Sequence, residues 1–408
     1  MANLEFSNLE FEEREGSLNV RLMGMFEFRI PLEELSRMYK SLISRNSIEL
    51  EGMPRAEAER KFNRLVAKHL PELRNRLNGR KAVYIHKNSG IPLFGTLYFG
   101  IVDKGTRMIE VKPVTGCNID CSFCSVGEGL HAGKMTDYVV EEDYLIEELE
   151  YLLEFKSDKG MGGGMEVFIN PHGEPLLYQN IVSLVRRIAA MEQVGRVSVM
   201  TNGALLSEDL IDRLADAGLS QINLSLNTLS REKGIELSGR NYDSGHVRRM
   251  AEYASKKLDI VLAPVWLKGV NDSDMEDLIS FAKELGCRMG IQKFIAHRKG
   301  KKPAKEISWE EFSEKLDEWG KKHGVKLGYN DAEDAGAANQ KTEELPMSFR
   351  RGDVIKAAVV CRGRRRNERI AAAEDRAITV FNCSEDTGRT VNIRIKTAKH
   401  NIFAGEKI

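Results

Sequence analysis

The chain has 408 residues, 42% of them apolar and 30% charged, which is ordinary for a globular protein of two or three domains. Its 61 basic and 61 acidic residues balance, so any preference for nucleic acid or anionic membrane has to be local. The acidic start predicts no secretory signal, and the longest apolar run, 260–267, is too short to cross a bilayer. We therefore expect a cytoplasmic protein without a membrane partner, whose clustered cysteines serve metal chemistry rather than disulfides.

Residues 1–106 predict an N-terminal α+β extension. Residues 18–30 alternate as a strand, and 31–44 carry a helical apolar stripe. Residues 55–77 predict a charged amphipathic helix that bends at Pro71, and 81–101 predict short strands. Two interpretations remain open, a cap packed on the next domain and a substrate-recognition module, and the cap is preferred.

Residues 107–300 predict a βα core. Apolar strand-like runs alternate there with amphipathic helices, which indicates parallel βα units wound into a sheet or an incomplete barrel. Ligands of such folds bind at the carboxyl ends of the strands. The expected strands are 107–113, 165–170, 196–201, 220–226, 259–265 and 289–295, and the expected helices are 141–156, 178–192, 207–217, 244–257 and 272–286.

Three cysteines follow the first expected strand, at Cys117, Cys121 and Cys124. Three thiolates at this spacing can hold a four-iron cluster and leave one iron open for chemistry. A structural zinc would need a fourth ligand such as His131, and no second pair of Cys or His at zinc spacing follows; three core cysteines are the other alternative. The iron–sulfur interpretation is preferred. The other cysteines, expected to be buried and inert, are Cys287, Cys361 and Cys383.

Polar residues also stand at the ends of later strands. Gly173 lets backbone approach a ligand closely, and Glu174 offers an anionic acceptor to a cation. Ser225 and Asn227 follow the fourth strand, where they either contact a ligand or satisfy barrel backbone. His172 is either a bystander at the rim or a group that faces substrate. Further candidates are Thr201, Asn202, Gln292 and Lys293.

The C-x3-C-x2-C spacing, with Phe123 before the last cysteine, resembles the radical S-adenosylmethionine superfamily. The resemblance covers about residues 107–296 and implies a partial (β/α)6 barrel, in agreement with the six units counted above. It implies a [4Fe-4S] cluster on the three cysteines, whose open iron binds S-adenosylmethionine, and an electron donor such as ferredoxin or flavodoxin. His172 departs from the Gly-Gly-Glu that is usual for this family. The residues implied to contact S-adenosylmethionine are Gly173, Glu174, Thr201, Asn202, Ser225 and Asn227.

The C-terminal part predicts a helix over 308–323, a polar linker over 331–344 and then short β segments. Residues 350–400 hold thirteen basic and six acidic residues, a net charge of +7. This tail resembles a TRAM domain, a small OB-like β-barrel attached to RNA-modifying enzymes. The alternative is a solvated basic face on a docking domain. The residues expected to contact phosphates are Arg364, Arg365, Arg366, Arg394 and Lys396.

The sequence therefore predicts a radical S-adenosylmethionine enzyme that modifies RNA, either tRNA or rRNA. One alternative is the same chemistry on a peptide or small molecule, and another is a non-catalytic iron–sulfur protein that binds RNA. Methylation, rearrangement and crosslinking all remain open. The predicted domains are the extension (1–106), the core barrel (107–300), a helical segment with linker (301–348) and the TRAM-like β-barrel (349–408).

Overall fold

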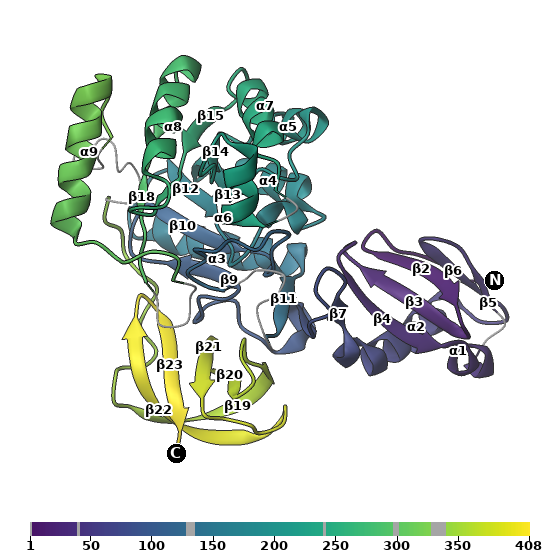
Figure 1. Cartoon of the computed structure of the whole chain (residues 1–408). Helices are drawn as coiled ribbons and strands as arrows, with labels where there is room; N and C mark the ends of the chain where they lie inside the picture. The colour runs from purple at the N-terminus through teal and green to yellow at the C-terminus, as the bar shows by residue number, and fades with distance from the viewer. Residues whose placement is uncertain (1, 39–40, 128–134, 240–241, 297–301, 328–339) are drawn as a thin grey trace.

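The computed structural model describes residues 2–38, 41–127, 135–239, 242–296, 302–327 and 340–408. Figure 1 shows an N-terminal lobe, a central core of sheet and helices, and a C-terminal β-barrel below the core. None of the described helices combines the length and apolar character that crossing a bilayer requires.

The N-terminal lobe holds two antiparallel sheets and two helices. The expected strand over 18–30 is two strands joined by a turn at Met23 and Gly24, because Met23 and Gly24 both adopt positive φ. The expected helix over 55–77 ends at His69, and the chain turns through η1 (Leu70–Glu72), which contains Pro71. The first sheet is β1 (Ala2–Glu5), β6 (Ser47–Leu50) and β5 (Ser41–Ile43), and the second is β2 (Leu9–Arg14), β3 (Ser17–Leu22), β4 (Phe26–Pro31) and β7 (Arg74–Asn75). The helices are α1 (Leu32–Met38) and α2 (Arg55–His69).

The core is built on a seven-stranded sheet. Six of its strands are parallel, and β9 (Gly100–Asp103) closes one edge antiparallel to the first of them. This confirms the expected partial (β/α)6 arrangement. The parallel strands are β10 (Met108–Lys112), β12 (Met165–Ile169), β13 (Val194–Thr201), β14 (Gln221–Leu224), β15 (Asp259–Leu262) and β17 (Arg288–Met289).

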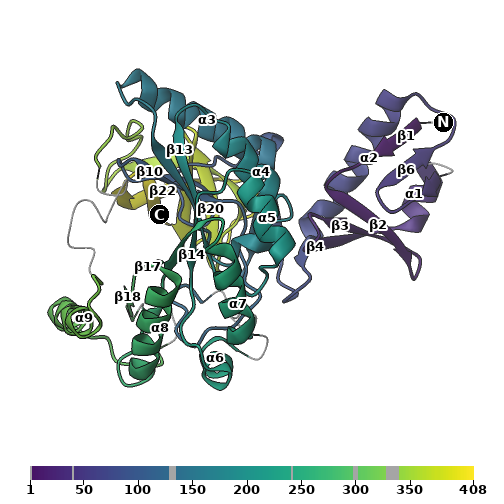
Figure 2. The ribbon, with the colours of Figure 1, turned by 90° about the horizontal axis from the view of Figure 1, so that it is seen from above.

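Helices cover the outer face of this curved sheet, as Figure 2 shows from above. Their buried stripes explain the placement: α4 (Ile181–Ala189) buries Ile181, Leu184 and Ile188 against the sheet. The other covering helices are α3 (Glu142–Asp158), α5 (Glu208–Asp216), α6 (Arg231–Ser238), α7 (Ser244–Ala254) and α8 (Asp272–Leu285). The short helix α6 was not expected from the sequence, and α9 (Trp309–His323) agrees with the predicted helix over 308–323.

Two small parallel pairs complete the core. Strand β8 (Ala82–Ile85) pairs with β11 (Asp137–Val140), and β16 (Val265–Trp266) pairs with β18 (Gln292–Lys293). Strands β8 and β9 therefore pair with core strands although both precede residue 107. The predicted domain limits stay a prediction. His131, residues 297–301 and most of the linker predicted over 331–344 lie outside the described residues.

The C-terminal strands form a closed five-stranded barrel in the order β19-β20-β21-β23-β22. Side chains alternate between the barrel interior and its surface, so Val359, Ile378 and Ile393 are fully buried. This confirms the expected small β-barrel. The strands are β19 (Val354–Arg362), β20 (Glu368–Ala373), β21 (Arg376–Phe381), β22 (Thr390–Lys399) and β23 (Ile402–Lys407).

The barrel docks on the core through backbone contacts and one buried ion pair. The N–H of Ala377 donates to the Phe94 carbonyl at 2.7 Å, and a Cβ on Gly95 would lie 2.1 Å from the Ala377 oxygen, so this junction requires glycine. Arg364 is only 1% exposed, and its Nη1 donates to Asp137 Oδ1 at 2.6 Å. The expectation that Arg364 contacts phosphate is therefore wrong, because its guanidinium is buried and hydrogen-bonded in the docking interface.

Candidate active site

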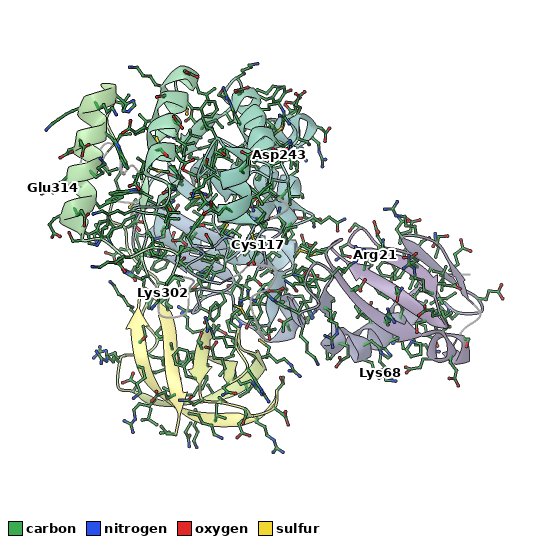
Figure 3. The ribbon with its side chains drawn as sticks, viewed as in Figure 1. Arg21, Lys68, Cys117, Asp243, Lys302 and Glu314 are labelled. Carbon is green, nitrogen blue, oxygen red and sulfur yellow. The ribbon has the colours of Figure 1, made fainter. Side chains whose placement is uncertain are left out.

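A cavity of about 560 Å³ opens at the carboxyl ends of the parallel strands. Figure 3 shows Cys117, one of its lining residues, near the middle of the molecule. All nine residues that the sequence singled out for cluster and ligand binding line this one cavity, although they come from four separate strand ends. They are Cys117, Cys121, Cys124, Gly173, Glu174, Thr201, Asn202, Ser225 and Asn227. Their individual roles stay predictions.

The cysteine loop is anchored to the next strand end by two glycines. The Gly116 N–H donates to the His172 carbonyl at 3.2 Å, and the Glu174 N–H donates to the Gly116 carbonyl at 2.9 Å. Gly173 has φ +136°, and a Cβ there would lie 2.0 Å from the Gly116 oxygen. Glycine is therefore required at position 173 because the backbone before Cys117 lies against it, whether or not a ligand in the cavity also approaches it.

The far side of the loop is held by helix α6. The Asp120 N–H donates to the Ser238 carbonyl at 3.0 Å, and the Ser122 N–H donates to the Leu237 carbonyl at 2.8 Å. Phe123 packs with Leu237 in a small apolar cluster that also contains Leu267 and Phe294. The aromatic residue before the third cysteine therefore fixes the loop by packing.

The three thiols fit an iron–sulfur cluster by their chemistry. Burial raises the pKa of the Cys117 thiol well above its ordinary value, and Glu174, Cys121 and Cys124 raise it further. Such a thiol stays neutral near pH 7 unless a metal binds it, since coordination deprotonates a thiol outright. Asn202 Nδ2 lies 3.7 Å from Cys117 Sγ, so an amide donor is already aimed at this sulfur.

Within the described part of the chain, no group of three or more His, Cys, Asp or Glu side chains is arranged to hold a metal ion. In a four-iron cluster each thiolate binds a different iron, so its sulfurs stand farther apart than the ligands of a single ion. Three cysteines supply three of the four iron ligands, which leaves one iron for a non-protein ligand in the cavity.

Glu174 is a buried carboxylate that joins two strand ends. It is 1% exposed, and it accepts hydrogen bonds from Thr201 Oγ1 at 2.7 Å, the Asn202 N–H at 2.9 Å and the Leu176 N–H at 3.0 Å. Burial raises the pKa of Glu174 to about 7, and the three donors only partly offset this effect. Glu174 thus orders the turn after β13 and also presents acceptor oxygens to the cavity.

Glu174→Gln is expected to change how stability depends on pH. The folded chain holds a proton on Glu174 between pH 4.5 and about 7, where the unfolded chain has released it, so stability falls as pH rises through this window. The loss is complete above pH 7 and amounts to about 3 kcal/mol. Urea unfolding of metal-free protein at pH 5 and pH 8 should show the variant losing less stability than the parent by about this amount.

The matched control for this titration is Glu154→Gln, at an exposed position on helix α3. It should leave the difference between the two pH values as it is in the parent. If Glu174→Gln behaved in the same way, the assigned pKa shift would be wrong.

Asn202 and Asn227 play different local parts. The Asn202 amide donates to Asn118 Oδ1 at 2.8 Å and accepts from the Ala204 N–H at 2.9 Å, so it supports the cysteine loop. Asn227 accepts from the Val265 N–H at 2.8 Å and donates to the Ser225 carbonyl at 3.2 Å. Of the two interpretations left open for Asn227, these contacts favour satisfaction of barrel backbone.

A charged group on the cavity wall was not expected from the sequence. Lys112 is 3% exposed, and its ammonium donates to Glu110 Oε2 at 2.8 Å and to the Asn170 carbonyl at 2.6 Å; Glu110 also pairs with Lys104. Burial lowers the pKa of Lys112. A signal was present, because Glu110 and Lys112 alternate with the buried Ile109 and Val111 and so share one face of the strand.

The remaining candidates divide between the cavity and the rest of the fold. His172 lines the cavity, and burial lowers its pKa to about 4, so it is neutral at pH 7. Lys293 also lines it, but its ammonium is held by Glu306 at 2.9 Å and lies 5.0 Å from the centre of the Trp309 ring. Cys287, Cys361 and Cys383 do not line this cavity.

The sequence pattern of the radical SAM superfamily matches residues 111–282. An uncharacterised protein of Methanocaldococcus jannaschii is 32% identical over an alignment 424 positions long, which covers 96% of this chain and 95% of that one. A GTP 3′,8-cyclase of Aquifex aeolicus is 29% identical over 200 residues, or 48% of this chain and 59% of that protein. A crystal structure of SuiB from Streptococcus suis aligns with a TM-score of 0.42 at 16% identity, over 79% of this chain and 71% of that one, a likeness too weak to bear on function.

Proposed function

Because the chain belongs to the radical S-adenosylmethionine superfamily, we propose that it modifies RNA, either tRNA or rRNA, at an unreactive carbon atom. The cofactors are a [4Fe-4S] cluster and S-adenosylmethionine. When bound and reduced, they supply a 5′-deoxyadenosyl radical. The assignment of RNA as the substrate is supported by the C-terminal barrel and its position.

The residues around the cavity prepare the site for this chemistry. Cys117, Cys121 and Cys124 supply three thiolates, and Asn202 and the Gly116–Gly173 contact hold their loop in place. Glu174 presents a carboxylate that can accept hydrogen bonds from the ammonium of S-adenosylmethionine. Apolar residues such as Ile119, Phe123 and Met200 line the same cavity and limit the access of water.

The observation that carries the RNA proposal is that the basic barrel is linked, through Asp137, to the turn before the cysteine loop. Residues 350–400 have a net charge of +7 in a chain of no net charge. Arg364 of this barrel bonds to Asp137, and Asp137 Oδ1 in turn accepts from Thr115 Oγ1 at 3.3 Å, two residues before Cys117. A polyanion held by the barrel would therefore lie next to the site that generates the radical.

The expected result for the proposed function is that RNA from a strain lacking this gene lacks one modified nucleoside, detected by comparative nucleoside mass spectrometry. Restoring the intact gene should restore that nucleoside, and restoring the Cys124→Ala gene should not. The purified protein, reduced by dithionite or by a ferredoxin or flavodoxin, should form more 5′-deoxyadenosine when RNA from the deletion strain is added.

Two results would overturn this proposal. An unchanged nucleoside profile, together with stimulation by a peptide or small molecule, would show that the substrate is a peptide or small molecule rather than RNA. No 5′-deoxyadenosine from protein with an intact and reduced cluster would favour a non-catalytic iron–sulfur protein.

A further inference from the structure

A second and larger recess, of about 870 Å³, lies at the seam between the C-terminal barrel and the core. Three stretches of chain far apart in sequence form it: residues 78–81, the start of the segment leading into β11 (residues 135–136), and residues 362–369 with Ser384 of the barrel. Six of its described lining residues are basic and none is acidic: Arg80, Lys81, Arg362, Arg365, Arg366 and Arg369. We call this recess the seam groove.

Neighbouring carboxylates cancel only part of the charge of the seam groove. Asp137, a buried carboxylate, is shared by Arg364 at 2.6 Å and Arg80 at 3.7 Å. Buried Glu368 accepts from the Arg365 N–H at 3.2 Å, and Glu72 pairs with Lys81 at 3.5 Å. Arg369 donates to the carbonyls of Glu385, Glu368 and Ser384, so its hydrogen bonds shape the wall without neutralising its charge. The seam groove therefore keeps a positive potential.

Two arginines at the open side of the groove are exposed, Arg362 and Arg366. Among the described residues, neither side chain forms an ion pair with a carboxylate. Guanidinium groups present planar, forked donors that match phosphate oxygens. Exposed arginines without a counter-charge, at the edge of a basic recess, are arranged for a ligand that carries several negative charges.

The side chains that line the groove also indicate which part of such a ligand they recognise. Among the described residues that line the groove there is no aromatic side chain on which a base could stack. The neutral polar groups, Asn78, Asn367 and Ser384, are hydrogen-bonding partners for phosphate and ribose oxygens. The groove is suited to the sugar–phosphate backbone rather than to base edges. An acidic protein surface is a poorer match, because stable protein interfaces have an apolar or aromatic centre.

We propose that the seam groove binds the phosphodiester backbone of a single-stranded segment of the RNA substrate, with Arg362, Arg365 and Arg366 as phosphate contacts. This inference rests on the proposed function and assigns the RNA path to a composite surface of core and barrel. Thr136 in its wall adjoins Asp137, which contacts the turn before Cys117, so the bound strand passes behind the cysteine loop. Arg394 and Lys396, on β22, are not among the groove's lining residues.

Two double variants of the full-length protein test this assignment. Arg362→Ala with Arg366→Ala removes two charges from the groove, and Arg389→Ala with Arg394→Ala removes two from exposed positions of the same barrel that do not line it. Binding of a labelled single-stranded RNA is measured by fluorescence anisotropy between 50 and 200 mM salt. The groove variant should bind roughly 20-fold more weakly at 100 mM salt, with a log–log salt slope smaller by about 1.4. The matched variant should stay within about twofold of the parent.

The outcomes separate this inference from the proposed function. Equal losses in both double variants, or a loss confined to the Arg389 and Arg394 variant, would place the RNA on the outer barrel face and overturn the groove assignment. Polyglutamate that binds the groove as tightly as RNA would favour an acidic polypeptide instead. A parent protein that binds no RNA, together with an unchanged nucleoside profile, would overturn the proposed function itself.

Retention of RNA-independent 5′-deoxyadenosine formation by the groove variant, in dithionite-reduced protein, shows that its core is intact. If that activity fell together with RNA binding while the matched variant kept both, the arginines would support the fold rather than contact RNA, which would also overturn the groove assignment.

Discussion

Cys124→Ala should abolish formation of 5′-deoxyadenosine, with a fall of more than about 100-fold. The expected loss is this large because altering a residue that only supports a metal ligand already costs about 10–100-fold, and this variant removes one of three ligands. Iron content and the visible absorption of the reconstituted protein should fall with the activity, which gives a readout that does not depend on turnover. Anaerobic reconstitution followed by iron analysis and chromatography of the products measures both.

The matched control is Cys287→Ala. Cys287 is half-buried just after helix α8, and it does not line the cysteine cavity, so the variant should keep its iron and its activity. Normal iron content and normal 5′-deoxyadenosine formation in Cys124→Ala would contradict the assignment of this thiol as a cluster ligand.

Asp137→Ala is expected to lower the free energy of unfolding by about 3–5 kcal/mol, because it leaves Arg364 buried without its carboxylate partner. Asp137 is fully buried, and it also accepts hydrogen bonds from Asn75 at 2.7 Å and Asn78 at 3.3 Å. One side chain thus connects the segment after the N-terminal lobe, the turn before Cys117 and the C-terminal barrel. Urea unfolding followed by far-ultraviolet circular dichroism measures the loss.

An exposed ion pair of the same barrel provides the comparison. Lys396 and Glu406 lie 3.1 Å apart with 49% and 45% of their side-chain surfaces exposed, so Lys396→Ala should change stability by less than about 1 kcal/mol. A loss below 1 kcal/mol in Asp137→Ala as well would show that the barrel does not depend on this buried pair.

The core was predictable because its signals are local. Most strands and helices from residue 107 to 296 carry their own apolar period, and the order of parallel strands follows from successive βα connections. The cysteine spacing is also local, so Cys117, Cys121 and Cys124 were found without knowledge of the fold. The ends of three later strands then identified six further residues that line the same cavity.

The N-terminal lobe was described less well. Met23 and Gly24 interrupt an alternating run that otherwise reads as one strand, and Pro71 turns the chain earlier than the charged pattern of residues 55–77 predicts. Helix α6 lacks a strong apolar stripe, so periodicity did not show it, although its carboxyl end holds the cysteine loop.

By itself, the sequence determined the parallel βα core, the three-cysteine loop, the short C-terminal β segments and their basic charge, because periodicity, spacing and composition are properties of short stretches of chain. The barrel that these segments form was implied by the resemblance to a TRAM domain. Only the tertiary structure decided which charged side chains are paired inside the fold. Arg364 and Arg366 are two residues apart, yet one is buried on Asp137 and the other is exposed at the seam groove. Whether an arginine binds a carboxylate or faces solvent depends on residues more than two hundred positions away in the sequence. A local sequence pattern carries no information about such contacts.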